Sequence, residues 1–429
     1  MESKDRSTSG FELPTNNFIN TKIQLIPCIS IIDNQYSMIL EKTLDVKPIP
    51  YGRQNITQED IDAVVKSLQS DFLTQGPAIA KFENAFAEYI GVKYAVAVSN
   101  GTAALHLCTM AMNVQPGDKV ITTPITFVAS ANCIRYCGGE VVFSDIDPNT
   151  FLLDVEIVRT LLEKHPKGTF KGIIPVDFAG AAINLETFKK LADEHDLWLI
   201  EDACHAPGGF FIDSKEKKQN CGNSAYADLA IFSFHPVKHI ATGEGGMITT
   251  NNKKLYDKLC LLRTHGITRD IELLQENHGI WYHEMQELGY NYRLSDIQAA
   301  LGSTQLKRAD EGLKRRKEIA HRYDEAFSSY KLNIKTPKYN EGHAFHLYII
   351  QVEDRKDLYN HLRENNIFAQ VHYIPAHTMP YYKNLGYKKG DYPIAEKYYE
   401  HCLSLPMYPT LSNEEQDYVI ETILNYFTK

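Results

Sequence analysis

Residues 94–112 have the sequence YAVAVSNGTAALHLCTMAM, in which a short β-branched run passes through Asn100-Gly101 into a helical pattern. The run Tyr94–Ser99 is typical of a strand, and Ala103–Met112 is typical of a helix that begins after a tight turn. Free N–H groups at such a helix start, helped by the helix dipole, bind phosphate groups. By itself this stretch fits an ordinary Asn-Gly turn with a plain helix cap equally well.

The same alternation of strand and helix patterns continues along the chain. Several runs are apolar nearly throughout, as in Gly172-Ile173-Ile174-Pro175-Val176, which suits a mainly parallel sheet covered on both faces. We therefore expect a large α/β domain over residues 49–305. Its first helix is predicted after Thr57, and the other expected elements are the strands Lys119–Thr123, Glu140–Asp145, Gly172–Asp177, Trp198–Asp202, Leu229–Phe234 and Gly246–Thr250 and the helices Leu185–His195 and Lys253–Arg263.

The pattern changes after a capping box at Ser295 and Gln298, which predicts one long charged helix running towards Phe327. It predicts a smaller α+β C-terminal domain over residues 306–429, with strands Phe345–Val352 and Ala369–Tyr373 and helices Arg355–Asn365 and Asn413–Tyr426. Residues 1–48 are rich in Ser, Thr and Asn at first, and their single apolar stretch has no clear partner. We expect them to be a partly disordered N-terminal extension.

Composition excludes several classes of protein. The chain has 429 residues, 43% of them hydrophobic and 23% charged, which is typical of globular proteins. A net charge of −9 without a long basic stripe argues against nucleic acid as a partner. Eight cysteines without a CxxC motif indicate reduced thiols, so we expect a cytoplasmic protein. The longest charge-free run, Tyr94–Gly117, is interrupted by polar residues and glycine, so no membrane span is expected.

Two more candidate sites follow strands of the predicted sheet. Asp202 ends an apolar strand and needs a cationic partner or hydrogen-bond donors; alone, it could equally be a helix cap. Lys238 follows the strand that ends in Phe232-Ser233-Phe234, where a lysine of lowered pKa suits Schiff-base chemistry. A lone loop lysine is usually just solvated, and the nearby Gly-Glu-Gly-Gly run (243–246) is no dinucleotide fingerprint.

Together the three sites match the needs of one cofactor. Pyridoxal 5′-phosphate requires a phosphate cradle, a carboxylate for its pyridinium nitrogen and a lysine for its aldehyde. The order of a helix-start glycine, a strand-end aspartate and then a lysine supplies all three, at Gly101, Asp202 and Lys238. We therefore expect a pyridoxal-phosphate enzyme without a metal site.

On these residues the chain resembles the DegT/DnrJ/EryC1/StrS sugar aminotransferases, which have the aspartate-aminotransferase (type I) fold. The resemblance runs from about Ile49 to Phe427 and is most marked for family members of pseudaminic acid synthesis. The stretches that carry it are IPYGRQ (49–54), LTQGPAIAKFE (73–83), TTPITFVASANC (122–133), EDACHAPG (201–208), FSFHPVKHIATGEGG (232–246), RTHGITRD (263–270), LGYNYRLSDIQAALG (288–302) and VHYIPAH (371–377). One departure is NGTAAL at 100–105, where close relatives often have Asn-Ser-Ala-Thr-Ser.

The resemblance implies a role for each matching residue. Lys238 would be catalytic, bound to the cofactor aldehyde and then carrying the proton, and Asp202 would pair with the pyridine nitrogen. Phe127 would stack on the ring, and His205, where many relatives have Gln, would lie near it. The remaining implied residues are Gly101, Thr102, Ala103 and Ser233 for the phosphate, Asn291 for the phosphate of a neighbouring subunit, and His372 and Tyr373 for the substrate. Phe127 could also be plain core, Asn291 a helix cap, and His372 and Tyr373 interface residues.

The resemblance further implies a homodimer with its active site at the subunit interface. The expected reaction moves an amino group, from L-glutamate, to C4 of a UDP-linked 4-keto-6-deoxy-N-acetylhexosamine. The same transamination on another nucleotide 4-keto sugar, a 4-keto-pentose or a GDP-linked sugar, stays open. A sugar 3-dehydratase of this family is disfavoured because it would have histidine at the position of Lys238. A non-catalytic regulator is disfavoured because no DNA-binding module is visible.

Overall fold

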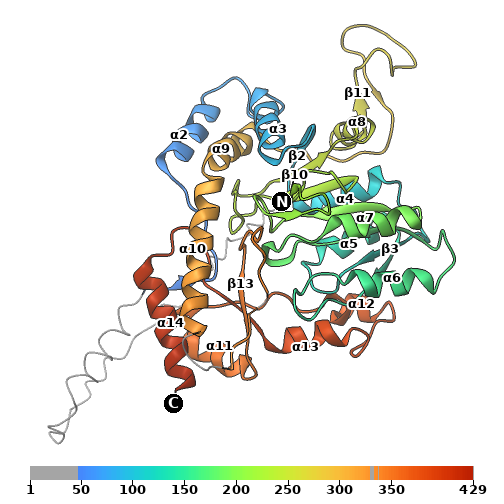
Figure 1. The fold of residues 1–429 in the computed structure, drawn as a ribbon. Coiled ribbons are helices and arrows are strands. Elements are labelled where there is room, and N and C mark those ends of the chain that lie inside the picture. The colour runs from blue at the N-terminus through green and yellow to red at the C-terminus, as the bar shows by residue number, and fades with distance from the viewer. Residues whose placement is uncertain (1–46, 329–332, 337, 429) are drawn as a thin grey trace, which may run out of the picture. The chain divides into compact units, whose positions relative to one another are not determined.

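The computed structural model describes residues 47–328, 333–336 and 338–428. Residues Lys47–Lys429 belong to one compact unit, built around a central sheet (Figure 1). The extension expected over residues 1–48 lies outside the described residues, except for its last two. The predicted division at residues 305 and 306 falls near the end of the helix α9 (Asp296–Lys307) and stays a prediction.

The central sheet has seven strands in the order β2-β10-β9-β6-β5-β3-β4. They correspond to the seven predicted strand patterns, and the predicted α/β class with a mainly parallel sheet is confirmed. Strand β10 alone is antiparallel to its neighbours, β2 and β9, whereas β9, β6, β5, β3 and β4 are mutually parallel. The strands are β2 (Tyr94–Val98), β3 (Lys119–Thr122), β4 (Glu140–Phe143), β5 (Phe170–Ile174), β6 (Trp198–Asp202), β9 (Leu229–Ser233) and β10 (Gly246–Thr250).

Both faces of this sheet are buried, as its apolar strands predict. On one face Ala95 and Leu199 pack with Phe86, Phe188 and other side chains of α3, α6 and α7. On the other face Val96 and Ile200 pack with side chains of α4, α5 and α8. These helices are α3 (Pro77–Ile90), α4 (Gly101–Ala111), α5 (Ala129–Tyr136), α6 (Val155–Glu163), α7 (Leu185–Glu194) and α8 (Lys253–Leu262).

The predicted long helix after Ser295 is in fact two helices. Ser295 and Gln298 form the expected capping box, but α9 ends at Lys307 and α10 (Ala309–Ser328) begins after Arg308. Arg308 leaves helical geometry, and its guanidinium bonds Asp60 on α2 (Gln58–Leu68) at 2.7 Å. The packing of α9 against α2 therefore accounts for the break between α9 and α10, where the sequence has no Gly or Pro.

The C-terminal part joins helices to short strand pairs. Strands β13 (Tyr348–Gln351) and β15 (Cys402–Leu405) pair antiparallel, and β1 (Ile49–Pro50) pairs with β14 (Ile367–Phe368) in parallel. The predicted strand Ala369–Tyr373 is wrong, because the chain leaves β14 after Phe368 and turns towards the large sheet. The other elements here are α11 (Arg355–Glu364), α12 (Pro380–Lys383), α13 (Pro393–His401) and α14 (Asn413–Phe427).

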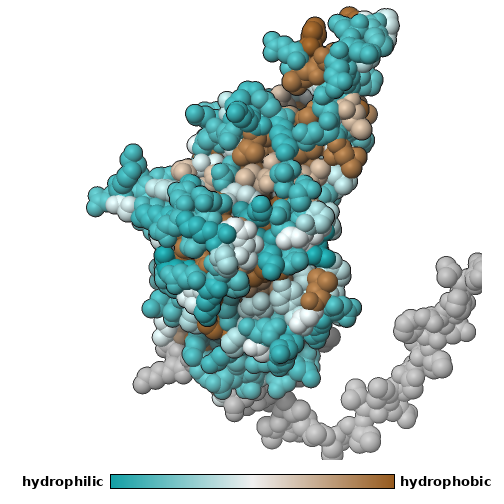
Figure 2. Space-filling model, turned by 90° about the vertical axis from the view of Figure 1, so that its right-hand side faces the viewer, coloured by the Kyte–Doolittle hydropathy of each residue, from teal (hydrophilic) through white to brown (hydrophobic). Residues whose placement is uncertain are grey.

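One segment projects from the body of the molecule beside α8, around the short strands β11 (Ile267–Thr268) and β12 (Glu284–Met285) (Figure 1). It carries exposed apolar side chains, among them Ile280, which is 97% exposed, and Trp281, which is 69% exposed. Figure 2 shows apolar side chains gathered on this projection. Among the described residues, no helix is long and apolar enough to cross a bilayer.

Candidate active site

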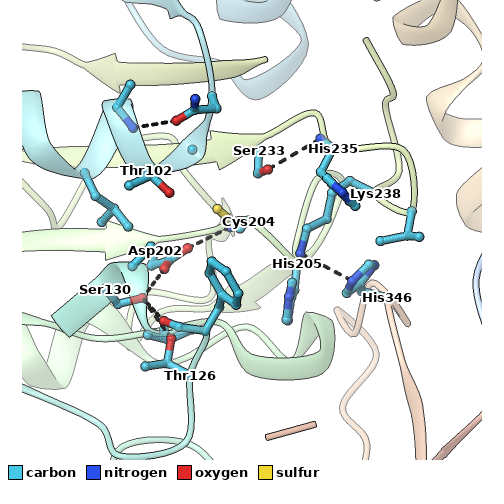
Figure 3. Close-up of a pocket in the computed structure, with 18 of the residues that line it drawn as sticks. Thr102, Thr126, Ser130, Asp202, Cys204, His205, Ser233, His235, Lys238 and His346 are labelled. Carbon is cyan, nitrogen blue, oxygen red and sulfur yellow. Dashed lines mark hydrogen bonds between the residues drawn. The ribbon is translucent and has the colours of Figure 1, made fainter. Parts of the chain in front are cut away.

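A cavity of about 690 Å³ opens at the edge of the sheet where β2, β6 and β9 end. All three sites expected from the sequence line it: the start of α4 with Thr102, the end of β6 with Asp202, and the turn after β9 with Lys238 (Figure 3). Ligands bind at this edge in open α/β sheets. The expected convergence of the three sites in one place is therefore confirmed.

The phosphate-sized corner of the cavity lies at the start of α4. Asn100 caps the helix with its side-chain oxygen, which accepts the Ala103 N–H at 2.8 Å, so Gly101 and Thr102 supply the other first-turn N–H groups. A Cβ on Gly101 would lie 3.0 Å from Ser233 Cβ, and one on Gly246 would lie 2.6 Å from Asn100 O. A side chain at Gly246 would clash with the backbone of Asn100, which explains the last residue of the Gly-Glu-Gly-Gly run, and one at Gly101 would make a tight contact with Ser233.

Asp202 lies deep in the cavity and is held by two donors. Ser130 Oγ donates to one carboxylate oxygen at 2.6 Å, and the Cys204 N–H donates to the other at 3.1 Å. Ser130 Oγ also lies 2.8 Å from Thr126 Oγ1. The strand β6 ends at Asp202 without starting a helix, so the alternative of a helix cap is wrong. The carboxylate is fixed in orientation and faces the cavity (Figure 3).

Lys238 is placed by a tight turn in which its N–H donates to His235 O at 2.8 Å. Its side chain enters the cavity, and Nζ lies 3.5 Å from His346 Nε2 (Figure 3). Burial lowers the pKa of Lys238 to about 8, with Asp202 acting in the opposite direction and the charge of Arg316 in the same direction. An amine with such a pKa is partly deprotonated near neutral pH, as a nucleophile requires.

Aromatic groups cover the opening of the cavity. Phe127 lines it with a side chain that is 60% exposed, so the alternative of plain core is wrong. His205 accepts the Ala179 N–H at Nδ1 (3.2 Å), so the neutral ring carries its proton at Nε2, which lies 3.3 Å from Tyr373 Oη. Burial lowers the pKa of His205 well below its ordinary value and keeps the ring neutral. The Tyr373 hydroxyl oxygen accepts a hydrogen bond from this N–H, so its own hydrogen is available to donate into the cavity.

His372 and Asn291 have different surroundings. His372 lines the cavity, is buried and bonds Ser404 Oγ through Nδ1 at 2.9 Å. Asn291 is exposed and is not among the residues that line the cavity of its own chain. Ser295 and not Asn291 caps α9, so the helix-cap alternative for Asn291 is wrong. The role expected for Asn291 in a neighbouring subunit stays a prediction.

Sequence reasoning did not assign several residues that line the cavity. Ser130 lies inside the quoted stretch TTPITFVASANC, four residues after Thr126, so helical spacing could have suggested it. Tyr51 lies inside the quoted stretch IPYGRQ, whereas His346 lies far from the other sites in sequence and carried no signal of its own. His346 is the more informative omission because it contacts the Lys238 amine.

Residues 54–424 match the model of the DegT/DnrJ/EryC1/StrS aminotransferase family. The chain belongs to this family. It is a pyridoxal-phosphate-dependent sugar aminotransferase, as the resemblance implied.

Individual relatives agree with this membership. The chain is 40% identical over 384 residues to a spore coat polysaccharide biosynthesis protein of Bacillus subtilis, covering 87% of this chain and 96% of that protein. It is 37% identical over 390 residues to the UDP-4-amino-4,6-dideoxy-N-acetyl-β-L-altrosamine transaminase of Campylobacter jejuni, covering 89% and 98%. A Streptococcus pneumoniae protein solved in its pyridoxamine-phosphate form is similar in structure, with a TM-score of 0.81, 32% identity and coverage of 89% and 99%.

The cofactor of this aminotransferase is pyridoxal 5′-phosphate, and the Streptococcus relative was also solved with it. The described residues fit this group. The start of α4 offers the first-turn N–H groups of Gly101 and Thr102, and Asp202 offers an oriented carboxylate. The ring of Phe127 is exposed over the cavity and is free to stack.

Proposed function

We propose that this aminotransferase transfers the amino group of L-glutamate to C4 of a UDP-linked 4-keto-6-deoxy-N-acetylhexosamine, in the cytoplasm. The observation that carries the proposal is the convergence of Thr102, Asp202 and Lys238 on one cavity. Similarity to the Campylobacter transaminase supports this sugar class and a role in pseudaminic acid or related amino-sugar synthesis. The seven cysteines that the structure describes are free, which supports a reducing compartment.

Each residue of the proposed active site has its own role in the reaction. When bound, pyridoxal phosphate accepts the electron pair of the breaking Cα–H bond and carries the amino group from donor to sugar. Asp202, oriented by Ser130 and the Cys204 N–H, holds a proton on the ring nitrogen. Gly101, Thr102 and Ser233 would hold the phosphate, with Thr102 and Ser233 offering hydroxyl groups, whereas the Ala103 N–H already donates to Asn100. Lys238 would take the Cα proton at its neutral amine and return it to C4′ of the cofactor, two bonds away across the nitrogen.

The opening of the cavity orients the sugar. Phe127 would stack on the cofactor ring that Asp202 holds, and both Phe127 and His205 lie beside Tyr373, with ring centroids 6.4 and 6.2 Å from it. Tyr373 donates its hydroxyl hydrogen to an oxygen of the bound molecule, because His205 already supplies the hydrogen bond that the Tyr373 oxygen accepts. His372, neutral because burial lowers its pKa to about 3, lines the same side.

We further propose that the active enzyme is a homodimer with its active site at the subunit interface. Two observations support this: Asn291 is exposed and away from the cavity of its own chain, and the projection around β11 and β12 carries Ile280 and Trp281 exposed. Exposed apolar groups of this size are typical of protein interfaces. In the dimer, Asn291 contacts the phosphate in the partner subunit's site.

Replacing Lys238 tests the proposal. We expect Lys238→Ala to lose the visible absorption band of the lysine-bound cofactor and to lower turnover by at least about 1,000-fold, because nucleophile and proton carrier are both removed. Lys254→Ala, on the exposed face of α8, is the matched control and should keep both. Unchanged turnover in Lys238→Ala would contradict the assignment.

A panel of substrates tests the sugar. Turnover should be highest with the UDP-linked 4-keto-6-deoxy-N-acetylhexosamine, followed by mass spectrometry of the amino-sugar product. A higher kcat/KM with a UDP-linked 4-keto-pentose or a GDP-linked 4-keto sugar would move the proposal to that substrate. Bound cofactor without turnover of any 4-keto sugar would favour the regulator instead.

A further inference from the structure

Arg316 on α10 is a buried cation whose hydrogen bonds go to the backbone. Its side chain is 1% exposed, and NH1 donates to the carbonyl oxygens of Phe345 (3.2 Å), His346 (3.2 Å) and Met407 (2.9 Å). Within the described part of the chain Arg316 forms no ion pair, whereas the partly buried Arg308 pairs with Asp60 at 2.7 Å. A buried charge without a carboxylate is costly, so its retention calls for a reason.

The carbonyls that Arg316 binds belong to the segment that presents His346 to the cavity. Main-chain contacts fix this segment: the Ala344 N–H donates to Gly180 O at 2.7 Å and the Leu347 N–H to Ala179 O at 3.2 Å. A Cβ on Gly180 would lie 2.9 Å from the backbone nitrogen of His346, so the two segments are in direct contact. His346 is therefore held through its backbone.

The imidazole of His346 has one polar contact, and that contact is with Lys238. Its Nε2 lies 3.5 Å from Lys238 Nζ, and its Nδ1 is buried without a hydrogen-bond partner in the described structure. The ring packs on His205, with 4.2 Å between ring centroids. Figure 3 shows His346 on one side of the Lys238 amine, with Asp202 across the cavity on the other side. A buried polar atom left unpaired in this way indicates a functional constraint on the ring.

We propose that His346 is a positioning residue for the Lys238 amine and that Arg316, through the backbone carbonyls of Phe345 and His346, holds His346 in place. This inference rests on the proposed role of Lys238. One N–H of the lysine amine donates to His346 Nε2, which leaves the lone pair of nitrogen for the cavity. Burial, together with the charges of Lys238 and Arg316, lowers the pKa of His346 and keeps it a neutral acceptor.

The charge on Lys238 responds to groups from several elements. Burial, the largest influence, and Arg316 both lower the pKa of Lys238, whereas Cys204 and Asp202 raise it. The neutral rings around the amine come from four different segments of the chain, and they are His205, His239, His346 and His372. Since burial lowers the pKa of each of these histidines, Arg316 is the cation whose removal should change the lysine most.

The test measures the Lys238 amine directly, in the full chain with the cofactor removed. Reductive methylation by formaldehyde and cyanoborohydride modifies only neutral amines, and peptide mass spectrometry follows Lys238 as a function of pH. We expect a midpoint at about pH 8 in the parent protein. Arg316→Gln and Arg316→Lys both lose the guanidinium nitrogen NH1 that binds three carbonyls, but only Arg316→Lys keeps the charge. The midpoint should therefore be about one pH unit higher in Arg316→Gln than in Arg316→Lys.

The two His346 variants should differ in the pH midpoint of Lys238 methylation. His346→Phe removes the acceptor that stabilises the ammonium form and should lower the midpoint, whereas His346→Gln keeps an acceptor and should stay near the parent value. Arg315→Gln is the control, since Arg315 bonds Leu411 O and Asn413 away from the cavity. Thermal melting reports folding, and the His346 pair decides the proposal if Arg316→Gln does not fold.

Failure of the inference about His346 can be distinguished from failure of the proposed function. A midpoint unchanged in His346→Phe, with or without a lower melting temperature, would mean that His346 is only structural and would overturn the inference. Such a result leaves the proposed function intact as long as Lys238→Ala abolishes the cofactor band. If Lys238→Ala instead keeps turnover, the proposed function fails, whatever the methylation midpoints are.

Discussion

At the scale of single residues, Ser130 makes the shortest contact to the carboxylate of Asp202. Its hydroxyl donates to Asp202 Oδ2 at 2.6 Å, and Thr126 Oγ1 lies 2.8 Å from Ser130 Oγ. Hydrogen bonds to a charged group contribute about 1.5–3 kcal/mol. We therefore expect Ser130→Ala to lower kcat by about 10- to 100-fold, because Asp202 loses its fixed orientation beneath the cofactor ring.

Steady-state kinetics of the purified enzyme checks this prediction. Ser130→Thr should retain most of the activity because it keeps the hydroxyl. Ser303→Ala serves as the control, since that hydroxyl bonds Ala299 O within α9. A Ser130→Ala enzyme with the parent kcat would show that the Cys204 N–H alone suffices to orient Asp202.

At the scale of elements, the contact between α2 and α9 depends on Asp60. This carboxylate is fully buried and accepts hydrogen bonds from Thr304 Oγ1 (2.6 Å), Gln305 Nε2 (2.9 Å) and Arg308 NH2 (2.7 Å). Breaking a buried pair leaves the partner charge uncompensated, so Asp60→Ala should lower the free energy of unfolding by about 3 kcal/mol. Glu59→Ala, which removes an exposed pair with Lys307, should change it by less than about 0.5 kcal/mol.

The carboxylate of Asp60 also makes the free energy of unfolding fall as the pH is lowered. These hydrogen bonds and the charge of Arg308 outweigh burial and lower the pKa of Asp60 from 3.8 to about 2. A depressed folded-state pKa contributes stability that is fully present above pH 3.8 and is lost as the pH falls towards 2. Denaturant unfolding of the parent and of Asp60→Asn between pH 5 and about 2 should show curves that converge as the pH falls. Parallel curves would contradict this account.

The elements differ in how well the sequence predicts them. The seven strands of the sheet follow β-branched runs between turn residues, so local pattern and buried position agree. The predicted strand Ala369–Tyr373 also alternates, but tertiary contacts turn it inward, where His372 and Tyr373 line the cavity. The break at Arg308 likewise arises from a partner, Asp60, that is distant in sequence.

The residues of the candidate site also differ in how well the sequence predicts them. Gly101, Asp202 and Lys238 were predictable because each stands at the end of a strand and matches a chemical need of one cofactor. His346 and Arg316 were not, because a histidine before a strand and an arginine in a charged helix look ordinary in sequence. Their relation to Lys238 exists only after the C-terminal part folds against the sheet.

At the scale of the whole molecule, the proposed shared active site predicts complementation between two defective chains. Lys238→Ala and Asn291→Ala should each be impaired as homodimers. A mixed dimer carries both changes in one site and neither in the other, so random mixing should restore roughly a quarter of the parent activity. Turnover after unfolding and refolding the two chains together measures this. Recovery no greater than the sum of the separate variants would contradict a site shared between subunits.

The single reversed strand, β10, has a consequence for the tolerance of the site to change. It lies between β2, which leads into the phosphate corner, and β9, which leads to Lys238, with Gly246 in register with Val98 and Ser233. Two strand spacings, about 9.5 Å, therefore separate the two anchor points. The sheet therefore fixes the distance between the phosphate corner and the start of the turn that carries Lys238. Because the loop between β9 and β10 contains Lys238 itself, its length must stay constant for the amine to reach the cavity.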